Sequence, residues 1–145
     1  MLLTASCWKN ASEEDMRADE RLKIQNFLSL NDSLSFIPTS SGLYHTDLKS
    51  GTGIKPDAND SVWVFYTMKL LSGVVLESND FTTDTLIFPV GKDYVFKGFD
   101  EGVTYIRQGG ESLFVVPSDL AFGGGSYNGY TPILLDVKLL KVEQH

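Results

Sequence analysis

Short apolar runs separated by turn-forming residues dominate the chain after residue 42. The run 61–71 (SVWVFYTMKLL) is rich in β-branched and aromatic residues and has apolar residues on both faces, which predicts a central strand. Pro89 lies in another run and cannot donate a ladder hydrogen bond, so we expect that strand at an edge or a bulge. Besides 61–71, the runs that predict strands are 43–49, 74–77, 86–90 (which contains Pro89), 111–116 and 133–142.

A short helix is expected within residues 95–107, between the apolar runs 86–90 and 111–116. Val95, Phe96, Phe99 and Val103 recur there at intervals of three and four residues. This spacing places them on one face of a helix. That face is a large apolar surface with almost no reactive chemistry on it.

A second helix, of modest stability, is expected over residues 12–30. Ser12 can cap its N-terminus, and the three acidic residues that follow favour the positive end of the helix dipole. The acidic positions from 13 to 20 are interpreted as a solvated spacer rather than an interaction motif. A weak apolar stripe along this helix comprises Met16, Ile24, Phe27 and Leu28.

Strands joined by short turns, with one helix inserted late, predict an α+β domain in which an antiparallel β-sheet wraps around a short helix. The helix over 12–30 is then an N-terminal extension. We expect residues 8–40 to form a polar spacer with this helix and residues 41–145 to form the folded domain. A length of 145 residues fits one domain with a sizeable core.

Composition and motifs exclude several classes of function. The net charge is −7 and the 12 basic residues are scattered, whereas nucleic-acid-binding proteins carry clustered Lys and Arg. No HExxH, Cys-x-x-Cys, Walker-type or Gly-x-Ser-x-Gly sequence occurs, so we expect no metal and no cofactor. His45 is interpreted as a strand-surface residue rather than a ligand.

Two segments carry a resemblance to a known family. Residues 91–103 (GKDYVFKGFDEGV) and 115–123 (VVPSDLAFG) resemble the signature of the FKBP-type peptidyl-prolyl cis-trans isomerases. The resemblance extends over about residues 41–143 and includes the closing strand 134–140 (LLDVKLL). It implies the sheet-around-helix fold and an enzyme that stabilises the twisted X–Pro amide in an apolar pocket without a covalent step.

The resemblance also implies which residues form the site. The catalytic positions fall on Tyr66, Phe99 and Phe122. Phe99 stands where the family has Trp, Phe122 where it has Tyr, and three Leu residues where it has Phe. These departures leave a second hypothesis open, a catalytically weak or inactive peptide-binding or chaperone module. The substrate-binding positions fall on Leu76, Glu77, Leu86, Val95, Phe96, Tyr127, Tyr130 and Leu135.

The sequence Ala5-Ser6-Cys7 resembles the end of a bacterial lipoprotein signal. This resemblance implies that residues 1–7 are the remnant of a signal and that Cys7 is lipidated, which would anchor the protein to a membrane in the bacterial periplasm. The alternative is an unmodified Cys7 in a cytoplasmic relative. In either case we expect a monomer that binds proline-containing segments of peptides or unfolded proteins, and in the periplasm one that assists the folding of exported proteins.

Overall fold

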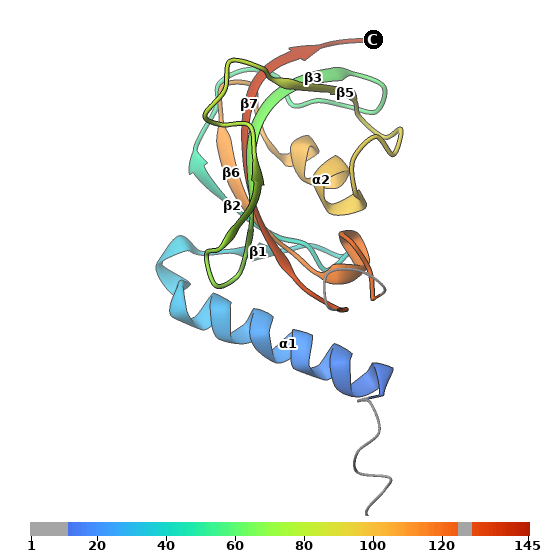
Figure 1. The fold of residues 1–145 in the computed structure, drawn as a ribbon. Coiled ribbons are helices and arrows are strands. Elements are labelled where there is room, and N and C mark those ends of the chain that lie inside the picture. The colour runs from blue at the N-terminus through green and yellow to red at the C-terminus, as the bar shows by residue number, and fades with distance from the viewer. Residues whose placement is uncertain (1–11, 125–128) are drawn as a thin grey trace, which may run out of the picture.

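The computed structural model describes residues 12–124 and 129–145. A long helix comes first, and the strands follow with a short helix between β5 and β6 (Figure 1). The elements are α1 (Glu13–Leu30), a 3-10 turn (Asp32–Leu34), β1 (Ile37–Pro38), β2 (Tyr44–Lys49), β3 (Ser61–Leu70), β4 (Val75–Ser78), β5 (Leu86–Pro89), α2 (Lys97–Gly102), η3 (Val103–Tyr105), β6 (Glu111–Val116), η4 (Ser118–Leu120) and β7 (Ile133–Glu143).

All strands belong to one antiparallel sheet with the order β1-β2-β6-β7-β3-β4, and β5 pairs with β3 beyond the end of β4. The predicted central strand is confirmed, because β3 has β7 along one side and β4 and β5 along the other. Pro89 lies opposite Ser61 at the end of β5, which pairs with no strand of the described residues other than β3. The expected edge position of this strand is therefore confirmed, and its proline removes no hydrogen bond from the sheet interior.

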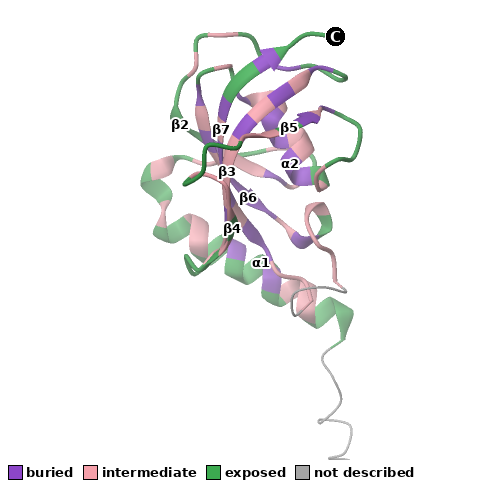
Figure 2. Cartoon of the chain, turned by 45° about the horizontal axis from the view of Figure 1, so that its top comes forward, coloured by how far each residue is buried: buried purple, intermediate pink, exposed green. Residues whose placement is uncertain are grey.

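The sheet curves around α2, so the core lies between its concave face and this helix (Figure 1). Alternate residues of β3 and β7 point inward, and Val64, Leu135, Val137 and Leu139 are fully buried. Phe99 of α2 packs against them with only 3% of its surface exposed. Figure 2 shows buried positions alternating with partly exposed ones along the strands of the sheet. The α+β fold expected from the sequence is confirmed.

The helix expected over 95–107 is shorter than predicted. α2 covers Lys97–Gly102 and passes directly into η3. Phe96 is the N-cap, with extended backbone angles, and its carbonyl accepts from the N–H groups of Phe99 and Asp100. Val95 and Phe96 therefore lie ahead of the helix rather than on its face. The apolar spacing was correct for the inward-facing residues, but it did not distinguish a helix from the turn that leads into it.

α1 begins where the sequence predicts. The N–H of Asp15 donates to the Ser12 hydroxyl at 3.1 Å, and the Ser12 N–H donates to the Asp15 carboxylate at 3.3 Å, which forms a capping box. Ile24 of the predicted stripe is buried. Glu20 is buried as well, with 6% of its surface exposed. Its interpretation as a solvated residue was therefore wrong. Within the described part of the chain, no helix is long and apolar enough to cross a membrane.

His45, interpreted as a strand-surface residue, is half-buried and its ring faces the core side of β2. Its ring stacks on Tyr105 with the centroids 4.6 Å apart, and it also lies 6.3 Å from the ring of Phe114. Burial lowers the pKa of His45. Residues directly opposite in an antiparallel pair share a face, so the pairing of His45 with the buried Phe114 explains the inward position.

Candidate functional site

Five aromatic rings meet where α2 approaches β3, with Phe99 at the centre. The Phe99 ring lies 5.4 Å from that of Tyr66, 5.5 Å from that of Phe88 and 5.7 Å from that of Phe96, each in an edge-on arrangement. Phe122 extends the cluster, with its ring 5.5 Å from that of Phe96. Edge-on contacts at these distances are favourable. The cluster therefore forms a firm apolar floor and two walls.

All of these rings except that of Phe88 line a cavity of about 150 Å³. Pockets for drug-sized ligands usually measure roughly 300–1,000 Å³. The cavity therefore fits one ring-sized group rather than a large molecule. Its lining residues are Tyr66, Met68, Glu77, Leu86, Val95, Phe96, Phe99 and Phe122.

The polar part of this lining consists of one linked pair. The Tyr66 hydroxyl donates a hydrogen bond to the carboxylate of Glu77, which reaches it from the neighbouring β4. Burial, together with this hydrogen bond, raises the pKa of Tyr66 to about 12. The phenol therefore stays protonated at physiological pH and keeps the carboxylate at the rim of the cavity.

Asn79 holds the loop 78–85 against β3 beside this pair. Its side-chain oxygen accepts from the N–H of Tyr66 at 2.7 Å, and its backbone N–H donates to the Tyr66 carbonyl at 3.1 Å. The side-chain amide also donates to Val64 and Asp84 carbonyls. The asparagine thus bridges the gap between β4 and β5 and fixes the backbone of Tyr66.

Comparison with known proteins identifies the family to which this chain belongs. Residues 52–140 match the model of the "FKBP-type peptidyl-prolyl cis-trans isomerase" family. The chain belongs to this family.

Individual relatives agree with the family match. The chain is 37% identical over 108 residues to the probable FKBP-type peptidyl-prolyl cis-trans isomerase FkpA of Neisseria meningitidis, covering 72% of this chain and 39% of that protein. It is 30% identical over 142 residues to the outer membrane protein MIP of Legionella longbeachae, covering 94% of this chain and 60% of that protein. The chain thus spans between about two fifths and three fifths of the length of these curated relatives.

A crystal structure of a peptidyl-prolyl cis-trans isomerase from Pseudomonas syringae superposes with a TM-score of 0.78 at 26% identity. The match covers 94% of this chain and 99% of that one, so it includes α1 as well as the sheet.

The structure brings together most of the site residues that the sequence predicted for this FKBP-type chain. Three others lie elsewhere among the described residues. Leu135 is fully buried in the core, and Leu76 packs against the core without lining the cavity. Tyr130 faces α1, where the guanidinium of Arg17 lies 4.8 Å from its ring centroid. The positions expected at Tyr127 and Cys7 lie outside the described residues.

Sequence reasoning missed Met68 and Asn79 as part of the site. Met68 is 5% exposed and lines the cavity, opposite Glu77 on one side and Leu135 on the other. Its position two residues after Tyr66 on a strand was the available signal, because alternate residues share a face. For Asn79 the polar character of the loop gave no indication of a bridging role.

Of the larger hollows that lie along α1, away from the ring cluster, two have volumes of about 390 Å³ and 410 Å³. The first separates α1 from the β3–β4 turn and includes Phe27, Leu30 and Leu71. The second separates α1 from the start of β2 and the segment after β6. Both lack the converging rings that line the smaller cavity, so the smaller cavity is the candidate site.

Proposed function

We propose that this chain catalyses the cis–trans isomerisation of X–Pro bonds in peptides and unfolded proteins. The observation that carries the proposal is the ring-lined cavity with Phe99 at its floor and the Tyr66–Glu77 pair at its rim, in a chain of the FKBP-type family. The cavity volume of about 150 Å³ suits a single pyrrolidine ring.

The chemistry follows from the electronic structure of the amide. Rotation about the bond loses resonance, with a barrier of about 18–20 kcal/mol. The planar amide is more dipolar than the twisted amide, so water stabilises the planar form preferentially. A dry apolar cavity removes this advantage and binds the twisted form relatively better. No nucleophile is involved, and we expect neither a chelator nor Cys7→Ser to change the rate.

Each side chain has a distinct part in this proposal. Phe99 supports the proline ring from below, while Phe96 and Phe122 enclose it from the side. Glu77 and Tyr66 supply the polar groups that set the direction of the peptide. The catalytic roles of Tyr66, Phe99 and Phe122 therefore rest on shape and exclusion of water rather than on proton transfer.

The test measures the cis-to-trans rate of a series of Ala-X-Pro-Phe peptides with and without the protein. Leu86→Ala and Ile87→Ala provide a matched pair on one strand, because Leu86 lines the cavity whereas Ile87 is 52% exposed. We expect acceleration by the wild type, a several-fold loss of kcat/KM in Leu86→Ala and no change in Ile87→Ala. An absence of acceleration at any X would overturn the proposal.

A peptide-binding or chaperone module is the alternative, and one observation favours it. Phe122 has no hydroxyl with which to meet a ligand at the mouth of the cavity. In that case, titration with the same peptides would shift the NMR signals of Phe96, Phe99 and Phe122 while the isomerisation rate stayed at its spontaneous value.

We further propose that the protein works outside the cytoplasm and is held to a membrane by lipid on Cys7. The sequence Ala5-Ser6-Cys7 supports lipidation, and the similarity to an outer membrane protein supports the location. Residues 1–7 would then be the signal remnant, 8–40 a spacer that includes α1, and 41–145 the isomerase domain. Fractionation and mass spectrometry of the native protein test this. Soluble protein with an unmodified Cys7 would overturn it.

A further inference from the structure

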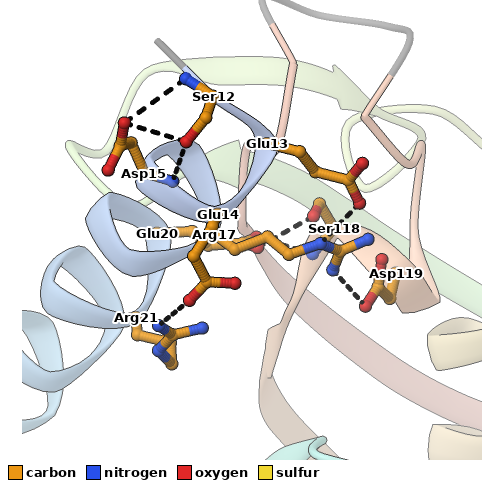
Figure 3. A network of polar contacts seen from close by, with 9 residues as sticks. All are labelled: Ser12, Glu13, Glu14, Asp15, Arg17, Glu20, Arg21, Ser118 and Asp119. Atoms are coloured by element: carbon orange, nitrogen blue, oxygen red, sulfur yellow. Dashed lines mark hydrogen bonds and ion pairs between the residues drawn. The ribbon is translucent and has the colours of Figure 1, made fainter.

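A buried carboxylate joins α1 to the segment that follows β6. Glu20 is 6% exposed, and its partner Ser118 is fully buried. The Ser118 N–H donates to one carboxylate oxygen at 2.7 Å and its hydroxyl donates to the other at 2.9 Å (Figure 3). A buried charge is costly unless it is hydrogen-bonded, and here both oxygens accept. The position of Ser118 is therefore fixed relative to the helix.

The other side of Ser118 controls the backbone around Phe122. The Ser118 carbonyl accepts from the N–H of Ala121 at 2.9 Å and from the N–H of Gly123 at 2.8 Å. These two bonds bracket Phe122, whose ring forms one wall of the cavity. One residue thus receives the carboxylate of α1 and holds the main chain on both sides of a cavity-lining ring.

Packing and a second ion pair keep the same segment in place. A side chain at Gly98 of α2 would approach Val116 to 2.4 Å and the Leu120 carbonyl to 3.1 Å, so α2 lies close against it. On the opposite side, Arg17 of α1 donates to the Asp119 carboxylate at 2.8 Å (Figure 3). Asp119 is exposed, so this pair contributes less than the buried one.

We propose that Glu20 is a positioning residue of the isomerase site, acting through Ser118 on Phe122, and that α1 is thereby a working part of this site. The inference rests on the proposed function and extends it beyond the ring cluster. Loss of the carboxylate would release Ser118, loosen the turn that carries Phe122 and weaken the grip of the cavity on the peptide.

The experiment compares four variants of the full chain by peptide isomerisation and by amide hydrogen exchange. Glu20→Ala removes both acceptors, while Glu20→Gln keeps the shape and can pair with the Ser118 N–H and hydroxyl oxygen. Glu14→Ala is the control on the helix, because Glu14 pairs with Arg21 of the same helix. Val142→Ala controls for a general loss of stability, because Val142 is buried at the far end of β7.

We expect Glu20→Ala to speed exchange at the Ala121 and Gly123 amides by about tenfold, with strand amides unchanged. Its KM should rise about threefold to tenfold, with a smaller change in kcat. Glu20→Gln should lie near the wild type, and Glu14→Ala should equal it. Exchange at these two amides within twofold of the wild type, or a KM change matched by Val142→Ala, would overturn the inference.

The exchange measurement separates this inference from the proposed function. If the wild type fails to accelerate isomerisation, the function is wrong and the comparison of exchange rates and peptide affinities alone decides on Glu20. Faster exchange and weaker peptide binding in Glu20→Ala would then still support the positioning role. Unchanged exchange would reject it.

Discussion

The two walls of the cavity are built by different physical means. On one side, Tyr66 of β3 and Phe96 lean edge-on against Phe99, whose ring is almost wholly buried. On the other side, Phe122 stands on a turn that is held by hydrogen bonds to Ser118. The first wall depends on many weak apolar contacts, whereas the second combines the ring contact of Phe122 with Phe96 with a few directional hydrogen bonds.

We call the side formed by Tyr66, Phe96 and Phe99 the ring wall, and the side formed by Phe122 and held through Ser118 the polar wall. The difference between them predicts different responses to substitution. Apolar contacts are individually weak, so the ring wall should lose stability in proportion to the area removed. A buried polar link has a single critical partner, and its loss leaves a desolvated group without a partner. We therefore expect changes in the ring wall to affect folding first and changes in the polar wall to affect peptide binding first.

Removal of the central ring should produce the largest effect. Phe99→Ala deletes a side chain that contacts three other rings, and such a change typically costs about 3–5 kcal/mol. Urea unfolding measures this loss. Tyr94→Ala is the control, because Tyr94 is 70% exposed and its loss should cost less than about 0.5 kcal/mol. Equal stability of the two variants would contradict the account of the ring wall.

Tyr66 allows the ring to be separated from its hydroxyl. Tyr66→Ala should lower kcat/KM by about tenfold, which corresponds to about 1.4 kcal/mol, because it opens the cavity to water. Tyr66→Phe keeps the packing on Phe99 and removes only the bond to Glu77, so its loss should be smaller. The isomerisation assay measures both variants. If the two variants lose the same activity, the hydroxyl rather than the ring is the important group.

Four of the rings predicted from the sequence, Phe122 included, come together around the cavity, whereas the polar link behind Phe122 was not predicted, and the reason is physical. Phe96 and Phe99 belong to an apolar spacing that indicates burial directly, and Tyr66 is assigned through the family resemblance. Glu20 and Ser118 are 98 residues apart, and neither lies in a pattern that distinguishes a buried polar pair from two solvated residues. Acidic residues are usually solvated, so the sequence alone places Glu20 in a solvated spacer.

The loop after β6 shows the same limit. From the sequence, Tyr130 is assigned to the site because the loop 124–131 lacks the family's Ile-Pro-Pro run and offers Tyr127 and Tyr130 in its place. In the structure, its backbone has a φ of 27° and its ring packs on Arg17 of α1. A glycine-rich segment can follow many paths, so residue type alone does not fix where a side chain points.

A gain of function should be possible at the polar wall. Phe122→Tyr adds a hydroxyl at the mouth of the cavity, and a new hydrogen bond to the peptide contributes about 0.5–1.5 kcal/mol. We therefore expect kcat/KM or peptide affinity to rise by a few-fold, up to about tenfold. The same substitution in a Glu20→Ala background should gain less, because the ring is no longer held. Equal gains in both backgrounds would show that the two positions act independently.

The smallest effect on the site is expected from a carboxylate on the outer face of the sheet. Asp136 of β7 faces Glu111 of β6, Lys138 of β7 and Asp80 of the loop 78–85. Lys138 binds the Asp80 carboxylate at 2.8 Å and so ties that loop to the sheet, next to the Asn79 contacts of the ring wall. Burial, and then the hydrogen bond with Glu111, raises the pKa of Asp136 from 3.8 to about 7.

Because the folded state binds this proton more tightly than the unfolded state, the stabilisation is complete below pH 3.8 and is lost as the pH rises towards about 7. Partial exposure screens the charge, so we expect the loss to be about 1 kcal/mol. Asp136→Asn should flatten the free energy of unfolding between these pH values, whereas Glu143→Gln, at an exposed position on β7, should not. Parallel pH profiles for the wild type and Asp136→Asn would refute the assignment. Isomerisation should be nearly unchanged in Asp136→Asn, because Asn79 holds Tyr66 through bonds that do not involve the outer face.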